Sequence, residues 1–203
     1  SKNVESIIID LRNNPGGLLD QAVAVCGKFL PVGTLVITTE GQSENQKAEY
    51  RTSKSGKTRK NPLVVLVNGG SASASEIVAG CFQDLRRAII VGEQTFGKGS
   101  VQSIIPLHDG SALRLTTARY YTPSHKVIHE KGITPDIIVP LSEEEERDLF
   151  LIRNIIGPES LNEQDRERLK NIKDPQLERA YDLLKGIQLF SKRNVKPVKI
   201  VEK

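Results

Sequence analysis

Hydrophobic runs alternate with turn sequences in the first half of the chain. Two runs are short, continuous and rich in β-branched residues, at Val4–Leu11 and Leu63–Val67, which is typical of strands buried on both faces. A glycine-rich turn follows each run, and apolar residues then recur at helical spacing over Leu18–Leu30 and Ser71–Asp84. A further apolar run covers Ala88–Val91. This order of strand, turn and helix predicts an α/β domain with a largely parallel sheet.

The middle of the chain carries two other patterns. Residues 38–61 contain six Lys or Arg, three Glu and no Leu, Ile, Val or Phe. We interpret them as a solvated hairpin or loop, with a binding patch for an acidic partner as the alternative. The runs Ser103–Leu107 and Ser111–Ala118 flank Asp109-Gly110, which predicts an antiparallel hairpin.

Helix-start patterns become frequent after Leu141. Three such patterns have capping-box spacing or a proline at the first helical position: Ser142–Glu145, Ser160–Glu163 and Asp174-Pro175. We therefore expect short amphipathic helices over residues 142–190 and an edge strand in the tail Val195–Val201. The predicted organisation is a core over residues 1–141, followed by a helical extension and tail over residues 142–203.

Composition narrows the class of protein. The chain has 203 residues, of which 37% are hydrophobic and 27% charged, as in soluble domains with a buried core. Its net charge is +4, but aromatic residues are only 4% and no basic helix or zinc-finger spacing occurs, so we expect no nucleic-acid partner. Cys26 and Cys81 match no metal or redox spacing and are expected to be buried free thiols, with a disulfide as the alternative.

The segment Asn68–Glu76 is the densest candidate for chemistry. Its small residues allow a sharp turn between a strand and a helix, and a hydroxyl there lies where unpaired N–H groups favour negative charge. Acyl transfer requires such a nucleophile beside donors for an oxyanion. The alternatives are a turn with a serine N-cap or a phosphate-binding loop, although the Gly-Lys-Ser/Thr of a P-loop is missing.

Two further segments are candidates for the same chemistry. Lys98 lies between two glycines, so its amine could enter a confined site, and as a general base it must be neutral, which requires its removal from water. The alternative is an exposed lysine in a turn. The glycines of Arg12–Gly17 follow a strand and could offer backbone donors to an oxyanion, or could simply form a tight turn.

Together these segments resemble the C-terminal processing (tail-specific) peptidases, which are serine proteases with a Ser–Lys dyad. The resemblance covers residues 4–140 and implies an α/β fold of the Clp protease/crotonase-like type, with a small helical C-terminal extension. Five collinear motifs carry it: Leu11-Arg-Asn-Asn-Pro-Gly-Gly17, Gly70-Ser-Ala-Ser-Ala-Ser-Glu-Ile77, Gly92-Glu-Gln-Thr-Phe-Gly-Lys-Gly99, Tyr120-Tyr-Thr-Pro123 and Lys131-Gly-Ile-Thr-Pro-Asp136.

The resemblance also implies roles for individual residues. The family's spacing between nucleophile and base, counted back from Lys98, selects Ser73 over its neighbouring serines. The polar residue four positions after the lysine is Gln102, which would orient the lysine. A straight strand would hold the two positions about 13 Å apart, so the chain must bend at Gly99 if both side chains are to meet. The implied oxyanion donors are the Ala74 N–H and an N–H of Gly16 or Gly17.

Two acidic residues of the motifs are expected to have structural roles. Asp84 matches an acidic position of the family, and Glu76 is interpreted as a residue that starts a helix or braces a loop. The sequence departs from the family at His129-Glu130, where relatives usually have Gln-Gly, and none of His108, His125 and His129 has a catalytic counterpart.

The implied reaction is hydrolysis of proteins near their C-terminus through an acyl-enzyme, without a metal or other cofactor. Family members carry a PDZ domain and an earlier part of the core that are absent from this sequence, so the fragment alone could be inactive. The resemblance implies substrates with C-terminal recognition signals and export to a bacterial periplasm or cell envelope. We also expect self-association through the strand edge at Val4–Leu11, with pairing of this edge to the chain's own tail Val195–Val201 as the alternative. The alternatives are a ligand-binding module of the same fold and a crotonase-like acyl-CoA enzyme.

Overall fold

The computed structural model describes residues 4–41, 47–53, 58–154, 163, 169 and 172–192. Sheet A is parallel, and its strands in spatial order are β1 (Ile7–Asp10), β4 (Leu63–Val67), β5 (Ile89–Gly92) and β8 (Ile137–Ile138). Sheet B is antiparallel, and its strands in spatial order are β3 (Ala48–Arg51), β2 (Leu35–Gly41), β7 (Ala112–Tyr121) and β6 (Ser100–Pro106).

Strand β4 is at the centre of sheet A, and all five of its residues are buried. Because side chains alternate along a strand, Val65 and Val67 face one core and Val64 and Leu66 face another. The prediction that this apolar run is a strand buried on both faces is confirmed.

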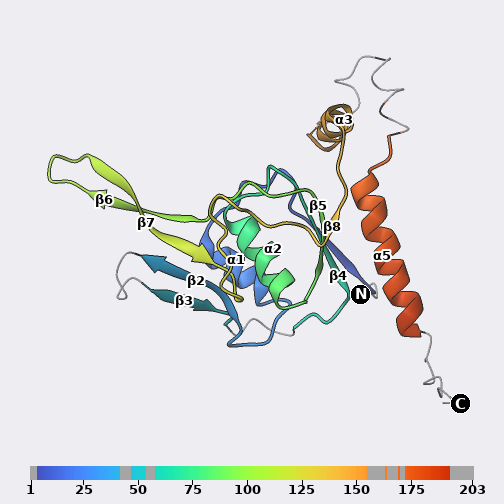
Figure 1. Cartoon of the computed structure of the whole chain (residues 1–203), viewed down its shortest axis with the longest axis horizontal. Helices are drawn as coiled ribbons and strands as arrows, with labels where there is room; N and C mark the ends of the chain where they lie inside the picture. The colour runs from blue at the N-terminus through green and yellow to red at the C-terminus, as the bar shows by residue number, and fades with distance from the viewer. Residues whose placement is uncertain are drawn as a thin grey trace, which may run out of the picture.

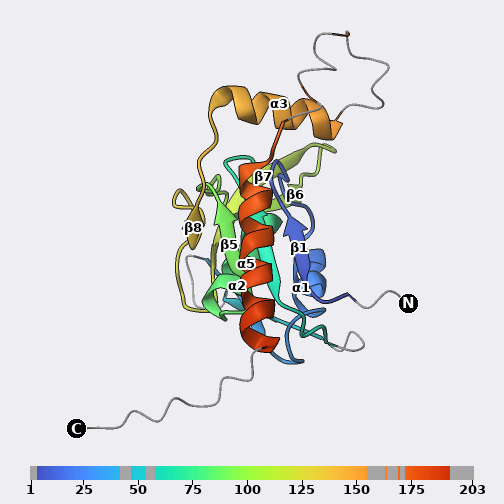
Figure 2. The same ribbon diagram turned by 90° about the vertical axis from the view of Figure 1, so that its right-hand side faces the viewer.

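Helices cover both faces of sheet A. The helices α1 (Leu19–Cys26) and α2 (Ala74–Asp84) lie between sheet A and sheet B, and α5 (Pro175–Lys192) lies on the outer face of sheet A (Figure 1). Figure 2 shows α5 running along the sheet. Its buried residues Ala180 and Leu184 belong to the same hydrophobic cluster as the apolar side chains of β4 and β5. Part of the predicted C-terminal extension is therefore packed against the domain.

Several predicted helix boundaries agree with the structure. Helix α3 (Glu143–Asn154) begins after Ser142, which exchanges hydrogen bonds with Glu145 in the predicted capping box. Proline is the first residue of α5, and Asp174 accepts the Leu177 N–H at 3.0 Å. Ser160 and the tail Val195–Val201 lie outside the described residues. No helix that the structure describes is both long and apolar enough to span a membrane.

Other predicted elements have different lengths. The helix predicted over Leu18–Leu30 ends at Cys26, because the following residues form tight turns in which Phe29 and Leu30 both donate to the Cys26 carbonyl. The charged segment contains the β2–β3 hairpin, which confirms the hairpin interpretation. The predicted hairpin around Asp109-Gly110 is longer than expected and projects from the body as β6 and β7 (Figure 1).

The two cysteines lie in the core that contains α1 and α2. Cys26 and Cys81 are free thiols without solvent exposure, as predicted. The hydrogen bond with Cys81, together with burial, raises the pKa of the Cys26 thiol above its ordinary value. Cys26 is therefore an unreactive packing residue, and Cys81 is enclosed in the same core.

Candidate active site

Ser73 occupies a strained turn between β4 and α2. It is the N-cap residue of α2 and has φ 56° and ψ −117°. A positive φ is costly for a residue with a side chain and persists only where the surroundings enforce it. In the nucleophile elbow of α/β-hydrolases, a strained strand-to-helix turn exposes the hydroxyl of a serine. Ser73 lies in a turn of the same kind. Ser71 and Ser75 do not have this conformation.

The hydroxyl groups of the two neighbouring serines are engaged with backbone atoms. Ser71 is fully buried, donates to the Leu11 carbonyl at 2.7 Å and accepts the Asn68 N–H at 3.0 Å. Ser75 is also buried and donates to the Asn14 carbonyl at 3.0 Å. Both serines brace the turn, whereas Ser73 is only partly buried.

The buried carboxylate of Glu76 joins the Ser73 turn to the Lys98 loop. Its Oε2 accepts the backbone N–H groups of Ser73 at 2.9 Å and Lys98 at 2.8 Å. Its Oε1 accepts the Thr95 hydroxyl at 2.5 Å and the Gly97 N–H at 2.7 Å. Four donors suit an ionised carboxylate, which is an acceptor only. These contacts support the interpretation of Glu76 as a loop-bracing residue.

The chain bends sharply at Lys98. The Gly99 N–H donates to the Gly97 carbonyl at 3.1 Å, which closes a three-residue turn centred on the lysine. Gly97 has φ 90°, and a Cβ on Gly99 would collide with the backbone of His129. The glycines on either side of Lys98 therefore permit both the bend and close packing, while the lysine side chain is exposed.

Gln102 lies on β6, directly after a bulge between Val101 and Gln102. Its side chain is exposed. Within the part of the chain that the structure describes, no hydrogen bond joins the side chains of Ser73, Lys98 and Gln102. The structure therefore brings the backbones of Ser73 and Lys98 together through Glu76 and does not pair their side chains.

The two glycines predicted as oxyanion donors differ in their surroundings. Gly16 has φ 95° and lies against the Ser73 turn, so that a Cβ there would be 2.5 Å from the Ala72 carbonyl oxygen and 2.7 Å from the Ala74 nitrogen. Its N–H already donates to the Asn14 side chain at 2.9 Å. Among the described residues, the N–H groups of Gly17 and Ala74 have no acceptor, so these two are the available donors.

The loop that carries the glycines is attached to the serine turn at several points. The Asn14 carbonyl accepts the Ala72 N–H at 3.0 Å, and the Asn13 N–H donates to the Asn68 side chain at 2.8 Å. Asn13 has φ 56°, and Gly70 packs against it so closely that a Cβ would clash. The loop and the turn therefore form one rigid unit.

A cavity of about 180 Å³ opens beside this unit. Gly16, Gly17 and Ala74 form one side of it. The rest of the wall is largely apolar and comes from α1, α2 and the residues before them: Leu11, Leu18, Ala22, Val25 and Val78. The cavity can accept an apolar side chain next to the candidate oxyanion donors.

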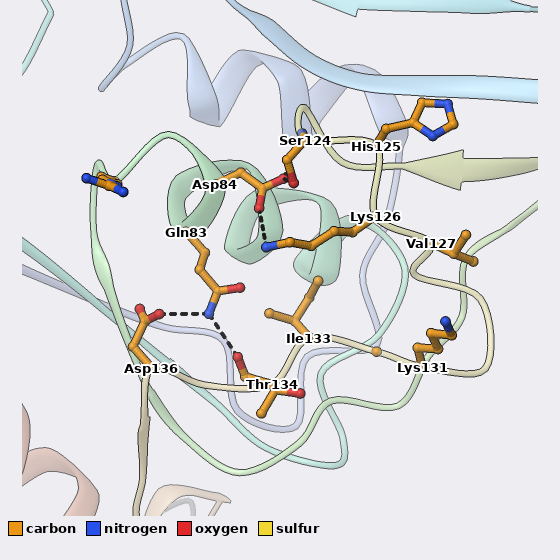
Figure 3. A pocket seen from close by; sticks show the side chains of 12 residues that line it. Gln83, Asp84, Ser124, His125, Lys126, Val127, Lys131, Ile133, Thr134 and Asp136 are labelled. Atoms are coloured by element: carbon orange, nitrogen blue, oxygen red, sulfur yellow. Dashed lines mark hydrogen bonds and ion pairs between the residues drawn. The ribbon is translucent and has the colours of Figure 1, made fainter.

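A larger groove of about 900 Å³ lies at the other end of α2 (Figure 3). Asp84 pairs there with the Lys126 Nζ at 2.8 Å and accepts the Ser124 N–H and hydroxyl at 2.9 and 2.6 Å. Burial would raise the pKa of Asp84, but these hydrogen bonds lower it overall. Asp84 is about 15 Å along the helix axis from Ala74, which supports the structural role expected for it.

Sequence reasoning missed one buried residue at the site. Arg12 belongs to the turn motif, yet its side chain contacts Asp174 and Gln176 at the start of α5. More than 160 positions separate these partners in the sequence. No local pattern indicates such a contact.

Comparisons with known proteins identify the family. The model of Peptidase family S41 matches residues 1–139. The chain belongs to this family. A carboxy-terminal-processing protease of Bartonella bacilliformis is 56% identical over 142 residues, which are 69% of this chain and 32% of that protein. A carboxyl-terminal-processing protease of Synechocystis is 41% identical over 91% of this chain and 38% of its own length. The chain thus spans about a third of the length of these curated relatives.

Solved structures agree with this assignment. A photosystem II D1 C-terminal processing protease has a TM-score of 0.62 and 37% identity, over 68% of this chain and 35% of that one. A putative S41 protease from Bacteroides fragilis has a TM-score of 0.63 at 19% identity, over 91% of this chain and 46% of that one, and so indicates the fold alone. The family resemblance and the Clp protease/crotonase-like α/β fold are confirmed.

Proposed function

We propose that this chain carries the catalytic dyad of a serine endopeptidase that cleaves proteins near their C-terminus. Ser73 is the nucleophile and Lys98 is the general base. The observation that carries the proposal concerns the Glu76 carboxylate, whose Oε2 atom accepts hydrogen bonds from the backbone N–H groups of both residues. The strained backbone of Ser73 supports its choice over the neighbouring serines.

In the proposed reaction, the Ser73 Oγ attacks the scissile carbonyl carbon and gives its proton to the neutral Lys98 amine. The oxyanion accepts hydrogen bonds from the N–H groups of Ala74 and Gly17. Lys98 then returns the proton to the leaving amine, and a water molecule hydrolyses the acyl-enzyme. Gln102 orients the lysine side chain. These steps need no cofactor.

The exposed side chain of Lys98 sets a condition on this reaction. A lysine is neutral near pH 7 only when its ammonium is taken out of water. In the proposed enzyme, the bound substrate and the parts that longer relatives possess cover the lysine. We further propose that the complete protein is exported and that it binds protein substrates with C-terminal recognition signals.

The cavity beside Gly17 gives the proposed enzyme a specificity pocket. Its volume of about 180 Å³ and its apolar wall suit a small or medium-sized apolar side chain. We therefore expect cleavage after residues such as alanine, valine or leucine rather than after charged residues. A peptide series that varies only this residue measures the preference.

The test uses the full-length protein and a peptide with an apolar C-terminal sequence. Ser73→Ala should lower kcat by about 10⁴-fold or more, as removal of a nucleophile does in other serine proteases. Ser191→Ala is the control, because Ser191 is an exposed residue near the end of α5. A covalent adduct of an activated ester should map to Ser73 by mass spectrometry. Equal turnover by wild type and Ser73→Ala would reject the assignment.

A further inference from the structure

Arg12 is a buried cation that connects the strand before the glycine loop to the last helix. Its side chain is 2% exposed. The Nε and Nη2 atoms donate to the two carboxylate oxygens of Asp10 at 2.9 and 2.6 Å. The Nη1 atom donates to Asp174 and to Gln176, both at 2.9 Å. The guanidinium thus binds β1 on one side and the start of α5 on the other.

The partners on α5 are themselves held in place. Asp174 accepts the Leu177 N–H at 3.0 Å and so caps the helix. Gln176 is fully buried, and its Nε2 donates to the Val139 carbonyl at 2.9 Å. The α5 partners of Arg12 are therefore themselves bound, Asp174 to the first turn of α5 and Gln176 to the residue that follows β8.

The electrostatics favour an intact network. Burial alone would lower the pKa of the Arg12 guanidinium, but the hydrogen bonds and charges of Asp10 and Asp174 raise it above the ordinary value. Removing one carboxylate would leave part of a buried charge uncompensated, which is strongly unfavourable. The side chain would then move toward water and pull on its own backbone.

That backbone leads directly into the candidate oxyanion loop. Asn13 follows Arg12 with a positive φ, and Gly16 packs against the Ser73 turn without room for a Cβ. A shift of the chain at Arg12 cannot be absorbed within so short and tightly packed a loop. It would reach Gly17, whose N–H must point at the developing oxyanion.

We propose that Arg12 is a positioning residue, which Asp174 and Gln176 hold so that the Gly17 and Ala74 N–H groups converge on one point. The inference rests on the proposed function, since it assigns those groups as oxyanion donors. It gives the start of α5 a positioning role at the site, which acts through Arg12. Loss of these Arg12 contacts should therefore weaken stabilisation of the transition state and leave substrate binding unchanged.

The other end of α5 supplies a matched control. There the Gln188 Nε2 donates to the Ser6 hydroxyl at 3.2 Å, just before β1. This contact joins the same helix to the same strand region, but at the end remote from the glycine loop (Figure 2). Gln188→Ala should therefore weaken the helix packing without moving Gly17.

The first test measures kinetics of the full-length protein. Arg12→Lys keeps the positive charge but loses the planar set of guanidinium donors. Asp174→Asn keeps a good N-cap residue but removes the carboxylate charge. Each should lower kcat about 10- to 100-fold with KM changed by less than about twofold, because a small misplacement of donors affects the transition state. A peptide boronate, which forms a tetrahedral adduct, should lose affinity in proportion to kcat/KM. Gln188→Ala should match wild type.

The second test does not depend on activity. Amide hydrogen exchange of residues 11–17 should become at least several-fold faster in Asp174→Asn than in wild type or Gln188→Ala. Unchanged exchange, or unchanged kcat in correctly folded variants, overturns the inference. If the wild-type protein hydrolyses no peptide, both the proposed function and the positioning role are overturned. The exchange measurement then shows separately whether the contact of Arg12 with Asp174 constrains residues 11–17.

Discussion

The backbone N–H groups of Ser73 and Lys98 donate to the same atom, the Oε2 of Glu76, at 2.9 and 2.8 Å. One buried carboxylate therefore sets the relative position of two segments that are far apart in the sequence. The side chains of Ser73 and Lys98 stay free to adjust when substrate binds, since their backbones and not their functional groups are fastened.

Glu76→Gln should loosen the junction between the two segments, because an amide oxygen can replace only one of the two carboxylate oxygens and cannot serve both pairs of donors. An amide offers one oxygen and one NH₂ group, so two of the four donors that face Glu76 would meet another donor. We expect kcat to fall about 100-fold, by loss of alignment. The free energy of unfolding should fall by about 2–4 kcal/mol, because buried donors lose their acceptor. Urea denaturation and steady-state kinetics measure the two effects.

The control for this variant is Glu178→Gln, which changes an exposed residue of α5. It should leave both kcat and the unfolding free energy close to wild type. If Glu76→Gln kept full activity in a folded protein, the carboxylate would have no part in aligning the dyad.

Lys98→Arg should inactivate the full-length protein. Arginine keeps the positive charge but does not lose its proton near neutral pH, so it cannot accept the proton of Ser73. A loss of about 10²- to 10⁴-fold in kcat is expected from removal of a general base. Lys131→Arg, at another exposed lysine, should behave as wild type. Wild-type-like turnover in Lys98→Arg would exclude lysine as the base.

Substitution by alanine should destabilise the protein at Gly16 but not at Gly17. Gly16→Ala places a Cβ 2.5 Å from the Ala72 carbonyl oxygen at a residue with φ 95°, so the glycine loop must move away from the Ser73 turn. We expect a loss of at least about 2 kcal/mol in unfolding free energy and most of the activity. Gly17→Ala meets no atom within 4 Å and keeps its N–H, so the protein should fold normally. Equal stability of the two variants in thermal denaturation would contradict this packing.

Local pattern was sufficient to predict most elements of sheet A and its helices. The run Leu63–Val67 identified β4 without error because a strand buried on both faces has no polar positions. Ser142 and Pro175 marked helix starts because capping depends on residues within one turn. Such features are encoded over a few neighbouring residues and can be read from the sequence.

Contacts between distant segments could not be predicted in this way. The two-residue strand β8 is too short for a recognisable pattern and exists because it pairs with β5. Arg12 was assigned only to a turn, since its partners Asp174 and Gln176 lie at the other end of the chain. For Glu76, the sequence suggested a bracing role but not the loop that it braces.

The unpaired edge of strand β1 leads us to expect association between molecules. It pairs only with β4 among the described strands, so its other edge presents unpaired backbone groups beside the partly buried Ile7, Ile8 and Ile9. In a parallel pair the N–H groups alternate, and Ile7 donates toward β4, so the Ile8 N–H points outward. We propose that this edge pairs with another chain segment. Sedimentation at low micromolar concentration should show dimers or larger species, and Ile8→Pro should reduce them. A protein that is monomeric at every concentration tested would exclude pairing through this edge.

The Asp84–Lys126 pair predicts how stability depends on pH. The hydrogen bonds to Asp84 lower its pKa in the folded state, so its stabilising contribution is complete above the ordinary pKa of aspartate and is lost as the pH falls through the folded-state pKa. Asp84→Asn should therefore cost about 2 kcal/mol of unfolding free energy at pH 7, and this difference should shrink below about pH 4. Asp182→Asn, at an exposed position of α5, should change little at either pH. Urea denaturation at pH 7, 5 and 3.5 measures the trend. A deficit of Asp84→Asn that is the same at all three values would mean that the carboxylate charge does not stabilise the end of α2.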